Sequence, residues 1–281
     1  MENITSEAFW AALLLTIFAG LSTGIGATLA FFSRTNNYTF LSIGLGFSAG
    51  VMVYISFVEI LVKAQQSFSL IYGEIVGEGL TLVAFFGGFI LTFIIDQIIP
   101  KDVNPHELRP QKEFTELQKD TEDLSLNKQA LKRTGTFTAI AITIHNFPEG
   151  FATFITSLDD LSLGIPIALA IAIHNIPEGM AISLPIYHAT GNKKKAFYYA
   201  LGSGIAEPIG ALVGFFLLLP LMGELTLGII FSMVAGIMVY ISFDELLPAA
   251  RIYGNEHTTI LGIGLGMGVM AFSLLLFKVI L

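Results

Sequence analysis

Two copies of one polar hexapeptide, His-Asn-x-Pro-Glu-Gly, lie inside long apolar stretches of this chain. Residues 145–150 read HNFPEG and residues 174–179 read HNIPEG. An ionisable group carried to membrane depth costs about 2.5–3.5 kcal/mol on insertion scales, so such groups persist mainly where they have partners. The two histidines and two glutamates of these motifs therefore predict a bound cation.

A helix would gather the polar side chains of each motif on one face. Residues four apart share a helix face, so the histidine of each copy would lie beside its glutamate, and the asparagine three residues before that glutamate would lie on the same stripe. Each copy thus offers an imidazole, an amide and a carboxylate. The six side chains are His145, Asn146 and Glu149 in the first copy and His174, Asn175 and Glu178 in the second.

A third carboxylate, Glu207, lies in a later apolar stretch and is followed by Pro208, which again combines an acid with a helix break. Gly150 and Gly179 follow the two motif glutamates and leave room for close helix approach. Three carboxylates in one place repel one another, and protons or cations must compensate them. Imidazole and carboxylate ligands suit zinc, iron and related divalent ions, whereas amide and carboxylate oxygens suit harder ions.

The composition places these groups in a membrane. Hydrophobic residues make up 54% of the 281 residues and charged residues only 13%, about half the charged share of a typical soluble domain. A helix needs about 20 mostly apolar residues to cross the hydrocarbon. Eight stretches meet this need: 8–32, 38–62, 76–99, 134–157, 162–187, 196–220, 225–248 and 258–280. We therefore expect an all-α membrane protein with a single transport domain over residues 1–281.

The basic residues predict the orientation, because Lys and Arg favour cytoplasmic loops. Of the 14 basic residues, all except Lys63 and Lys278 fall on one side of an eight-span arrangement. We expect both termini outside, a solvated cytoplasmic loop at about 100–133 that could include a short helix, and a multi-pass protein of the inner (plasma) membrane. The start of the chain has no basic region, so no removable signal peptide is expected. The absence of cysteine excludes thiolate ligands and disulfides.

An internal repeat relates the second and seventh stretches. Residues 48–61 read SAGVMVYISFVEIL and residues 234–247 read VAGIMVYISFDELL, with ten of fourteen positions identical. These spans would cross in opposite directions, which is typical of secondary transporters. We expect spans 1–3 and 6–8 to form an inverted repeat around spans 4 and 5. Glu59, Asp244 and Glu245 could line the two ends of a metal path, or could be ordinary interfacial acids.

With these motifs the chain resembles the ZIP family of divalent-metal transporters, in its bacterial ZupT-type branch, over essentially its whole length. The resemblance rests on the paired hexapeptides, the eight spans and the long loop after the third span. It implies a site for two metal ions, bridged by Glu149 and Glu178. The first ion would be held by Glu149, His174 and Glu178, with His145 as a neighbour or ligand. The second would be held by Asn146, Glu149, Asn175, Glu178 and Glu207.

The function expected from these features is import of divalent cations into the cytoplasm. Zn²⁺ and Fe²⁺ are the expected cargo, and the mixed nitrogen and oxygen ligands also admit Mn²⁺, Co²⁺ and Cd²⁺. These ions would be transported, so no cofactor and no enzymatic activity are expected. The expected partners are the metal ions and the lipid bilayer, without nucleic acid. Several glycines could support packing within or between subunits and so allow a homodimer: Gly44, Gly46, Gly262, Gly264, Gly266 and Gly268.

Two other classes of function compete with transport. An intramembrane zinc-dependent hydrolase is one alternative, because His and Glu around zinc can activate water. The sequence contains no His-Glu-x-x-His pattern, which counts against a metalloprotease. A metal sensor or scaffold is the other alternative. It would need a soluble output domain, and residues 100–133 are too short and too polar to form one.

Overall fold

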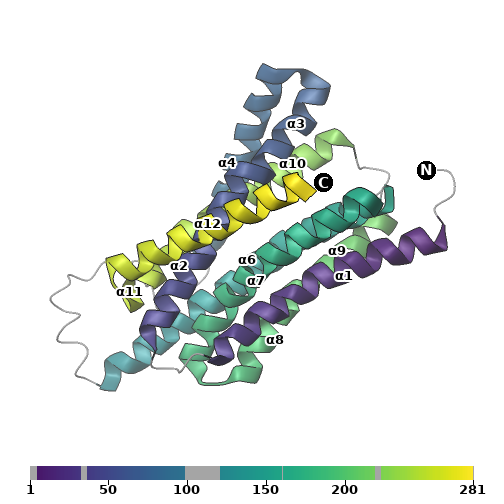
Figure 1. Cartoon of the computed structure of the whole chain (residues 1–281). Helices are drawn as coiled ribbons and strands as arrows, with labels where there is room; N and C mark the ends of the chain where they lie inside the picture. Colours follow the sequence, from purple (N-terminus) through teal and green to yellow (C-terminus); the bar gives the residue numbers. More distant parts are fainter. Residues whose placement is uncertain (1–4, 33–36, 99–120, 160, 219–222, 281) are drawn as a thin grey trace.

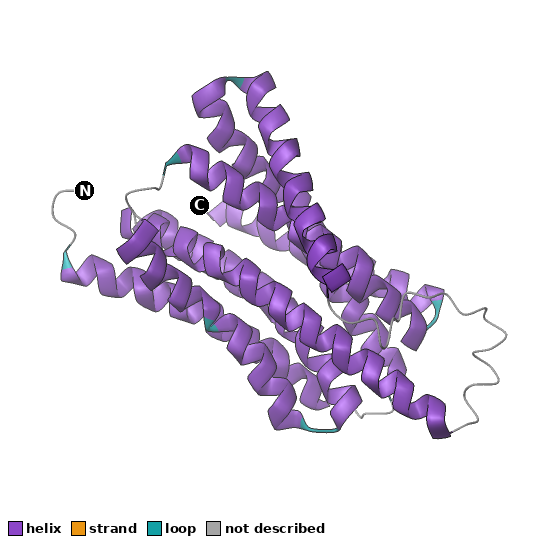
Figure 2. Ribbon diagram, turned by 180° about the vertical axis from the view of Figure 1, so that it is seen from behind, coloured by secondary structure: helices purple, strands orange, loops and turns teal. Residues whose placement is uncertain are grey.

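The structure, a computed structural model, describes residues 5–32, 37–98, 121–159, 161–218 and 223–280. Within these segments the secondary structure is helical throughout (Figure 2), which confirms the predicted all-α class. Seven helical stretches among them are long and apolar enough, by length and composition, to cross a membrane. The further long helix α6 (Thr121–Asp159) lies among them and carries the first polar hexapeptide.

The helices follow one another with short connections. The first half of the chain contains α1 (Ser6–Leu29), η1 (Ala30–Phe32), α2 (Tyr38–Ile55), η2 (Ser56–Ile60), α3 (Leu61–Tyr72) and α4 (Glu74–Ile98). After α6 come α7 (Leu161–Thr190), α8 (Lys193–Gly204), α9 (Ala206–Val213), η3 (Gly214–Leu218), α10 (Glu224–Ile241), η5 (Ser242–Leu246), α11 (Leu247–Tyr253) and α12 (Glu256–Ile280). The short segments η2, η3 and η5 are π-helical.

Local sequence signals account for several helix ends. The Asn37 side chain accepts a hydrogen bond from the backbone N–H of Phe40 at 3.0 Å and caps α2. Asn192 caps α8 in the same way, through the N–H of Lys195. Gly73 (φ +80°) and Gly191 (φ +67°) follow α3 and α7 in the left-handed region that glycine adopts without strain. The chain can therefore reverse tightly between neighbouring spans.

The helices form two groups (Figures 1 and 2). In the first, which we call the motif group, α1 packs on α7 and α8, and α6 packs on α7 and α9. In the second, the repeat group, α2 packs on α12, and α10 packs on α3 and α4. The start of α1, the end of α12 and the turn at Gly73 lie at one end of the molecule, which we call the terminal end.

The two copies of the internal repeat run antiparallel within the repeat group. The first copy occupies α2, η2 and the start of α3, and the second occupies α10, η5 and the start of α11. The helix α10 packs on α3, while η5 and α11 pack on α2, so the beginning of each copy lies beside the end of the other. Both copies contain a π-helical segment at the same place, Ser56–Ile60 in one and Ser242–Leu246 in the other.

Two predicted boundaries were wrong. The second span does not end at 62, because α3 continues the helix to Tyr72 with Ala64, Ser67 and Phe68 buried on one face. On the other face, Lys63 and Gln65 are partly exposed and Gln66 is exposed. Such a polar face of an amphipathic helix resembles a helix end in a hydropathy plot. The helix α6 begins at Thr121 rather than at 134, and the helix within the expected 100–133 loop agrees with the short helix that the segment could include. Arg34 and residues 99–120, used in the orientation argument, lie outside the described residues.

Glycines allow the closest approaches in the motif group. A Cβ atom on Gly179 would overlap the carbonyl oxygen of Thr23 in α1, and one on Gly150 would overlap the backbone of Glu207 in α9. These contacts confirm that both motif glycines permit close helix approach. The polar residue before each glycine is thereby held against a neighbouring helix.

Two adjacent glycines of α4 offer a test of this packing. A Cβ on Gly88 would overlap the carbonyl of Met233 in α10, whereas a Cβ on Gly87 would meet nothing within 4 Å. Gly88→Ala should lower the free energy of unfolding in detergent by about 1–3 kcal/mol through overpacking. The matched control Gly87→Ala gains the same helix propensity without a clash and should be neutral or stabilising. Equal stabilities of the two variants would contradict the α4–α10 contact.

Candidate metal centre

The polar side chains of the two hexapeptides meet where α6 and α7 pack against each other. His145 and Asn146 from α6 and Asn175 and Glu178 from α7 are at most 1% exposed, and His174 is 2% exposed. Glu207 joins them from the first turn of α9 and is also fully buried. The helix breaks at Ile205, just before Glu207 and Pro208, as the proline predicts.

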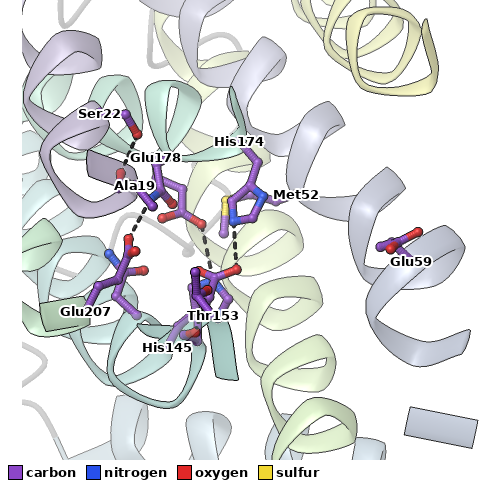
Figure 3. Close-up of polar contacts among 12 residues, drawn as sticks. Ala19, Ser22, Met52, Glu59, His145, Thr153, His174, Glu178 and Glu207 are labelled. Atoms are coloured by element: carbon purple, nitrogen blue, oxygen red, sulfur yellow. Dashed lines mark hydrogen bonds and ion pairs between the residues drawn. The ribbon is translucent and has the colours of Figure 1, made fainter. Parts of the chain in front are cut away.

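Four of these side chains form one connected cluster (Figure 3). The His174 Nε2 atom lies 2.9 Å from Oε1 of Glu149, so the two hexapeptides are linked across the helix interface. The His145 Nε2 atom lies 3.4 Å from Oε2 of Glu149 and 3.3 Å from Oε1 of Glu178. These separations are ion-pair distances without good hydrogen-bond geometry. Two imidazoles and two carboxylates thus converge from both helices.

The two motif asparagines are oriented by backbone carbonyls of other helices. The Asn146 amide donates from Nδ2 to the carbonyl of Ser203 at 3.2 Å. The Asn175 amide donates to the carbonyl of Ala19 at 2.9 Å and to Oε1 of Glu207 at 2.5 Å. Because each NH₂ group is used in this way, the opposite Oδ1 atom is left as an acceptor. The fold therefore supplies two amide oxygens with fixed directions.

The cluster contains more buried ligand atoms than the protein can satisfy. Oδ1 of both asparagines, both oxygens of Glu178 and Oε2 of Glu207 have no hydrogen-bond donor among the described residues, and the histidine nitrogens also lack a partner with hydrogen-bond geometry. Unsatisfied buried polar groups are costly, and unpaired buried carboxylates are more so. One ligand atom from each of His145, His174 and Glu178 lies within 4.8 Å of the others. The donor set fits one or more divalent cations, which would satisfy these atoms together.

A cavity of about 550 Å³ leads to this cluster. Glu149, whose side chain is 11% exposed, and His174 lie on its wall. The cavity extends past η2 to Lys63 and Gln66 on α3 and to Glu224 in the first turn of α10. Those residues lie toward the terminal end, so the cavity connects that end of the molecule with the cluster. Its walls come from both the motif group and the repeat group.

A second acidic group lies toward the opposite end. Oxygen atoms of Asp96, Asp244 and Glu245 lie within 4.8 Å of one another. Arg133 on α6 contacts Asp96 at 3.5 Å, and the Tyr240 hydroxyl lies 3.5 Å from the other Asp96 oxygen. Arg133 precedes His145 by twelve residues, which is about 18 Å along a helix. Glu59 and this acidic group thus flank the cluster from its two sides.

The structure adds residues that sequence reasoning missed. Ser48 donates from Oγ to the carbonyl of Pro177 at 2.7 Å, which ties the first repeat copy to the second hexapeptide. Met52, four residues further along α2, is 1% exposed and lies beside His174 in Figure 3. Both lie in the repeated segment, where Met52 is one of the ten identical positions, whereas Ser48 aligns with Val234. The repeat was therefore a signal for Met52 but not for Ser48. Nothing in their types alone pointed to the cluster.

Comparisons with known proteins match nearly the whole chain. A sequence model described as "ZIP Zinc transporter" matches residues 6–274. A protein named Zinc transporter ZupT from Campylobacter jejuni is 57% identical over 97% of this chain and 98% of its own length. Proteins of the same name from Streptococcus mutans and Clostridium perfringens are 56% and 51% identical, over 97% and 95% of this chain and 99% and 95% of their own lengths.

Metal binding should stabilise the folded protein in a way that depends on the central carboxylates. A ligand that binds only the folded state adds about 2.7 kcal/mol at a hundred times its dissociation constant. Cd²⁺ should therefore raise the unfolding temperature of the detergent-purified protein, and Glu149→Gln and Glu178→Gln should lose most of that rise. Glu78→Gln, which changes an exposed carboxylate on α4, is the matched control. An undiminished rise in both central variants would exclude these carboxylates as ligands.

Proposed function

The chain belongs to the ZIP family of zinc transporters, and from that premise we propose that it imports Zn²⁺ and related divalent cations into the cytoplasm through the cluster between α6, α7 and α9. Fe²⁺ is the second expected cargo, and Mn²⁺, Co²⁺ and Cd²⁺ fit the same mixed ligands. The observation that carries this proposal is a buried set of carboxylates, imidazoles and amides at the end of a cavity. The intramembrane hydrolase alternative gains nothing from relatives that are named transporters.

We assign two cation positions to the cluster. The first uses Glu149, His174, Glu178 and His145, whose side chains approach one another within 3.4 Å in successive pairs. The second uses Asn146, Asn175 and Glu207, together with the same two glutamates. The separate Oδ1 acceptors and Glu207 Oε2 support this assignment, because they lack donors among the described residues. Glu149 and Glu178 would bridge the two ions and share their positive charge.

The cargo would reach these ligands by stepwise loss of water. The cavity is open enough for a partly hydrated ion to approach Glu149 and His174. Each ligand atom from the protein then replaces one water, so the ion is never left without coordination. With both termini outside, as the basic residues predict, the cavity faces outward and the Asp96, Asp244 and Glu245 group faces the cytoplasm. An ion leaving the cluster would meet those acids next.

Zinc flux is the direct test of the function. Purified protein in proteoliposomes should take up ⁶⁵Zn²⁺, and Glu149→Ala and Glu178→Ala should each reduce the initial rate at least about tenfold, because each removes a bridging ligand and the carboxylate partner of an imidazole. The exposed control Glu78→Ala should transport at the wild-type rate. Wild-type uptake in both bridging variants would refute the site.

Competition between ions tests the ligand chemistry. Imidazole nitrogens favour borderline transition metals over Mg²⁺ and Ca²⁺, which prefer oxygen ligands. Unlabelled Fe²⁺, Co²⁺ or Cd²⁺ in tenfold excess should therefore suppress ⁶⁵Zn²⁺ uptake, while the same excess of Mg²⁺ or Ca²⁺ should leave most of it. In His174→Ala, inhibition by the transition metals and inhibition by Mg²⁺ or Ca²⁺ should become more similar, since the substitution removes an imidazole from the cavity wall. Equal inhibition by Mg²⁺ and Cd²⁺ in the wild type would contradict the assigned ligands.

A further inference from the structure

Lys63 is the only lysine or arginine among the described residues that line the cavity. Its Nζ atom lies 2.8 Å from Oε1 of Glu59, one helical turn earlier. The Lys63 and Glu59 side chains are 42% and 29% exposed, so this ion pair lies on the cavity wall and not in the packed interior. A fixed positive charge beside the path of a cation needs a physical reason, because it repels the ion that the path carries.

The position of Glu59 is set by the π-helical segment η2. Ser56 opens this segment and donates from Oγ to the carbonyl of Met52 at 2.6 Å. Ser242 makes the equivalent contact with Met238 at 2.8 Å and opens η5. Single π-helical turns inside α-helices are frequent at functional sites. The repeat thus builds the same local structure twice, and each copy presents a glutamate, Glu59 in the cavity and its equivalent Glu245 in the second acidic group.

The lysine, by contrast, is not part of the repeated structure. Alignment of the two copies places Ala249 at the position equivalent to Lys63. Ala249 is buried in the core, so the helix forms there without any charge. The π-helical segment and its glutamate therefore do not require a lysine four residues after the glutamate. Lys63 is therefore specific to the first copy, where it lines the cavity and forms an ion pair with Glu59.

Resting on the proposed function, we propose that Glu59 binds an arriving dication on the cavity wall before the ion reaches Glu149, and that Lys63 is a tethered counter-ion that keeps this early binding weak. The ammonium group occupies the carboxylate while no metal is present and competes for it when a metal arrives. A conducting path needs sites that bind strongly enough for entrance and weakly enough for departure. Lys63 keeps binding at Glu59 weak enough for the ion to depart, and Glu149 deeper in the cavity then receives the ion.

The two residues should affect transport in opposite directions. Without the lysine, the Glu59 carboxylate is uncompensated and holds a dication longer, so the half-saturating zinc concentration and the maximal rate should both fall. Without the carboxylate, zinc binds less readily at low concentration, so the half-saturating zinc concentration should rise while the maximal rate stays near that of the wild type. If the pair had a purely structural role, the two variants would not shift the half-saturating zinc concentration in opposite directions. Uptake at low zinc should also become more sensitive to ionic strength in the lysine variant, since an unpaired exposed charge is screened by salt.

The experiment measures initial ⁶⁵Zn²⁺ uptake into proteoliposomes over a range of zinc concentrations. Lys63→Gln should lower the half-saturating concentration about threefold to tenfold, and Lys63→Met should do the same with an apolar side chain. Lys63→Arg keeps the charge and should match the wild type. Glu59→Gln should raise the half-saturating concentration. In Glu59→Gln/Lys63→Gln, removal of the lysine should have little further effect, because contacting partners are not additive.

Two results would overturn this inference while zinc uptake by the wild type stands. One is a Lys63→Gln curve that superimposes on the wild type or shifts to higher zinc. The other is full additivity in the double variant, which would mean that the lysine does not act through Glu59. A wild-type protein that takes up no zinc would instead refute the proposed function, and this inference with it.

Discussion

Three carboxylates buried among apolar helices are the feature on which the rest of this structure depends. Glu149, Glu178 and Glu207 would repel one another strongly if they were simply placed together. The protein surrounds them with two imidazoles and uses one amide hydrogen of Asn175 on Glu207. Within the part of the chain that the structure describes, Oε2 of Glu149, both oxygens of Glu178 and Oε2 of Glu207 have no hydrogen-bond donor. The bundle thus fixes an excess of negative charge in place, and a bound cation is the group that can neutralise it.

Close helix packing prevents the carboxylates and amides of the cluster from rearranging to satisfy one another. The amides of Asn146 and Asn175 are held by carbonyls on α8 and α1, and the glycines after Glu149 and Glu178 remove the side chains that would separate these helices. A small displacement of α1 or α8 would release an amide and let it turn to the nearest carboxylate. Packing in the motif group therefore determines which atoms face the cavity. Each asparagine is anchored to a backbone carbonyl, which moves only when its helix moves.

The sequence predicted the helical class and the meeting of the polar motif side chains more fully than it predicted the surroundings of that cluster. The paired hexapeptides have a fixed spacing on a helix, so which side chains share a face follows from helix geometry alone. The ends of α3 and α6 did not follow, because an amphipathic or polar helical segment resembles a loop when only hydropathy is considered. The carbonyls of Ala19 and Ser203, which accept hydrogen bonds from the motif asparagines, could not be predicted for a different reason. Every residue has a backbone carbonyl, so the residue type gives no signal. The Arg133–Asp96 contact joins residues 37 positions apart and depends on how the helices pack.

The order of charged groups along the cavity gives the proposed path a direction. Toward the terminal end the cavity wall carries two carboxylates, the exposed Glu224 and the partly exposed Glu59, and Glu59 is already paired with Lys63. Glu149 follows with 11% of its side chain exposed, and Glu178 behind it is fully buried. Water screens charges less at each step, so the same carboxylate attracts a dication more strongly the deeper it lies. The hydration that the ion loses also increases along this order, and the growing number of protein ligands offsets that loss. An ion is therefore drawn from a weak exposed site toward a strong buried one, and the pairing of Glu59 with Lys63 makes the first step reversible.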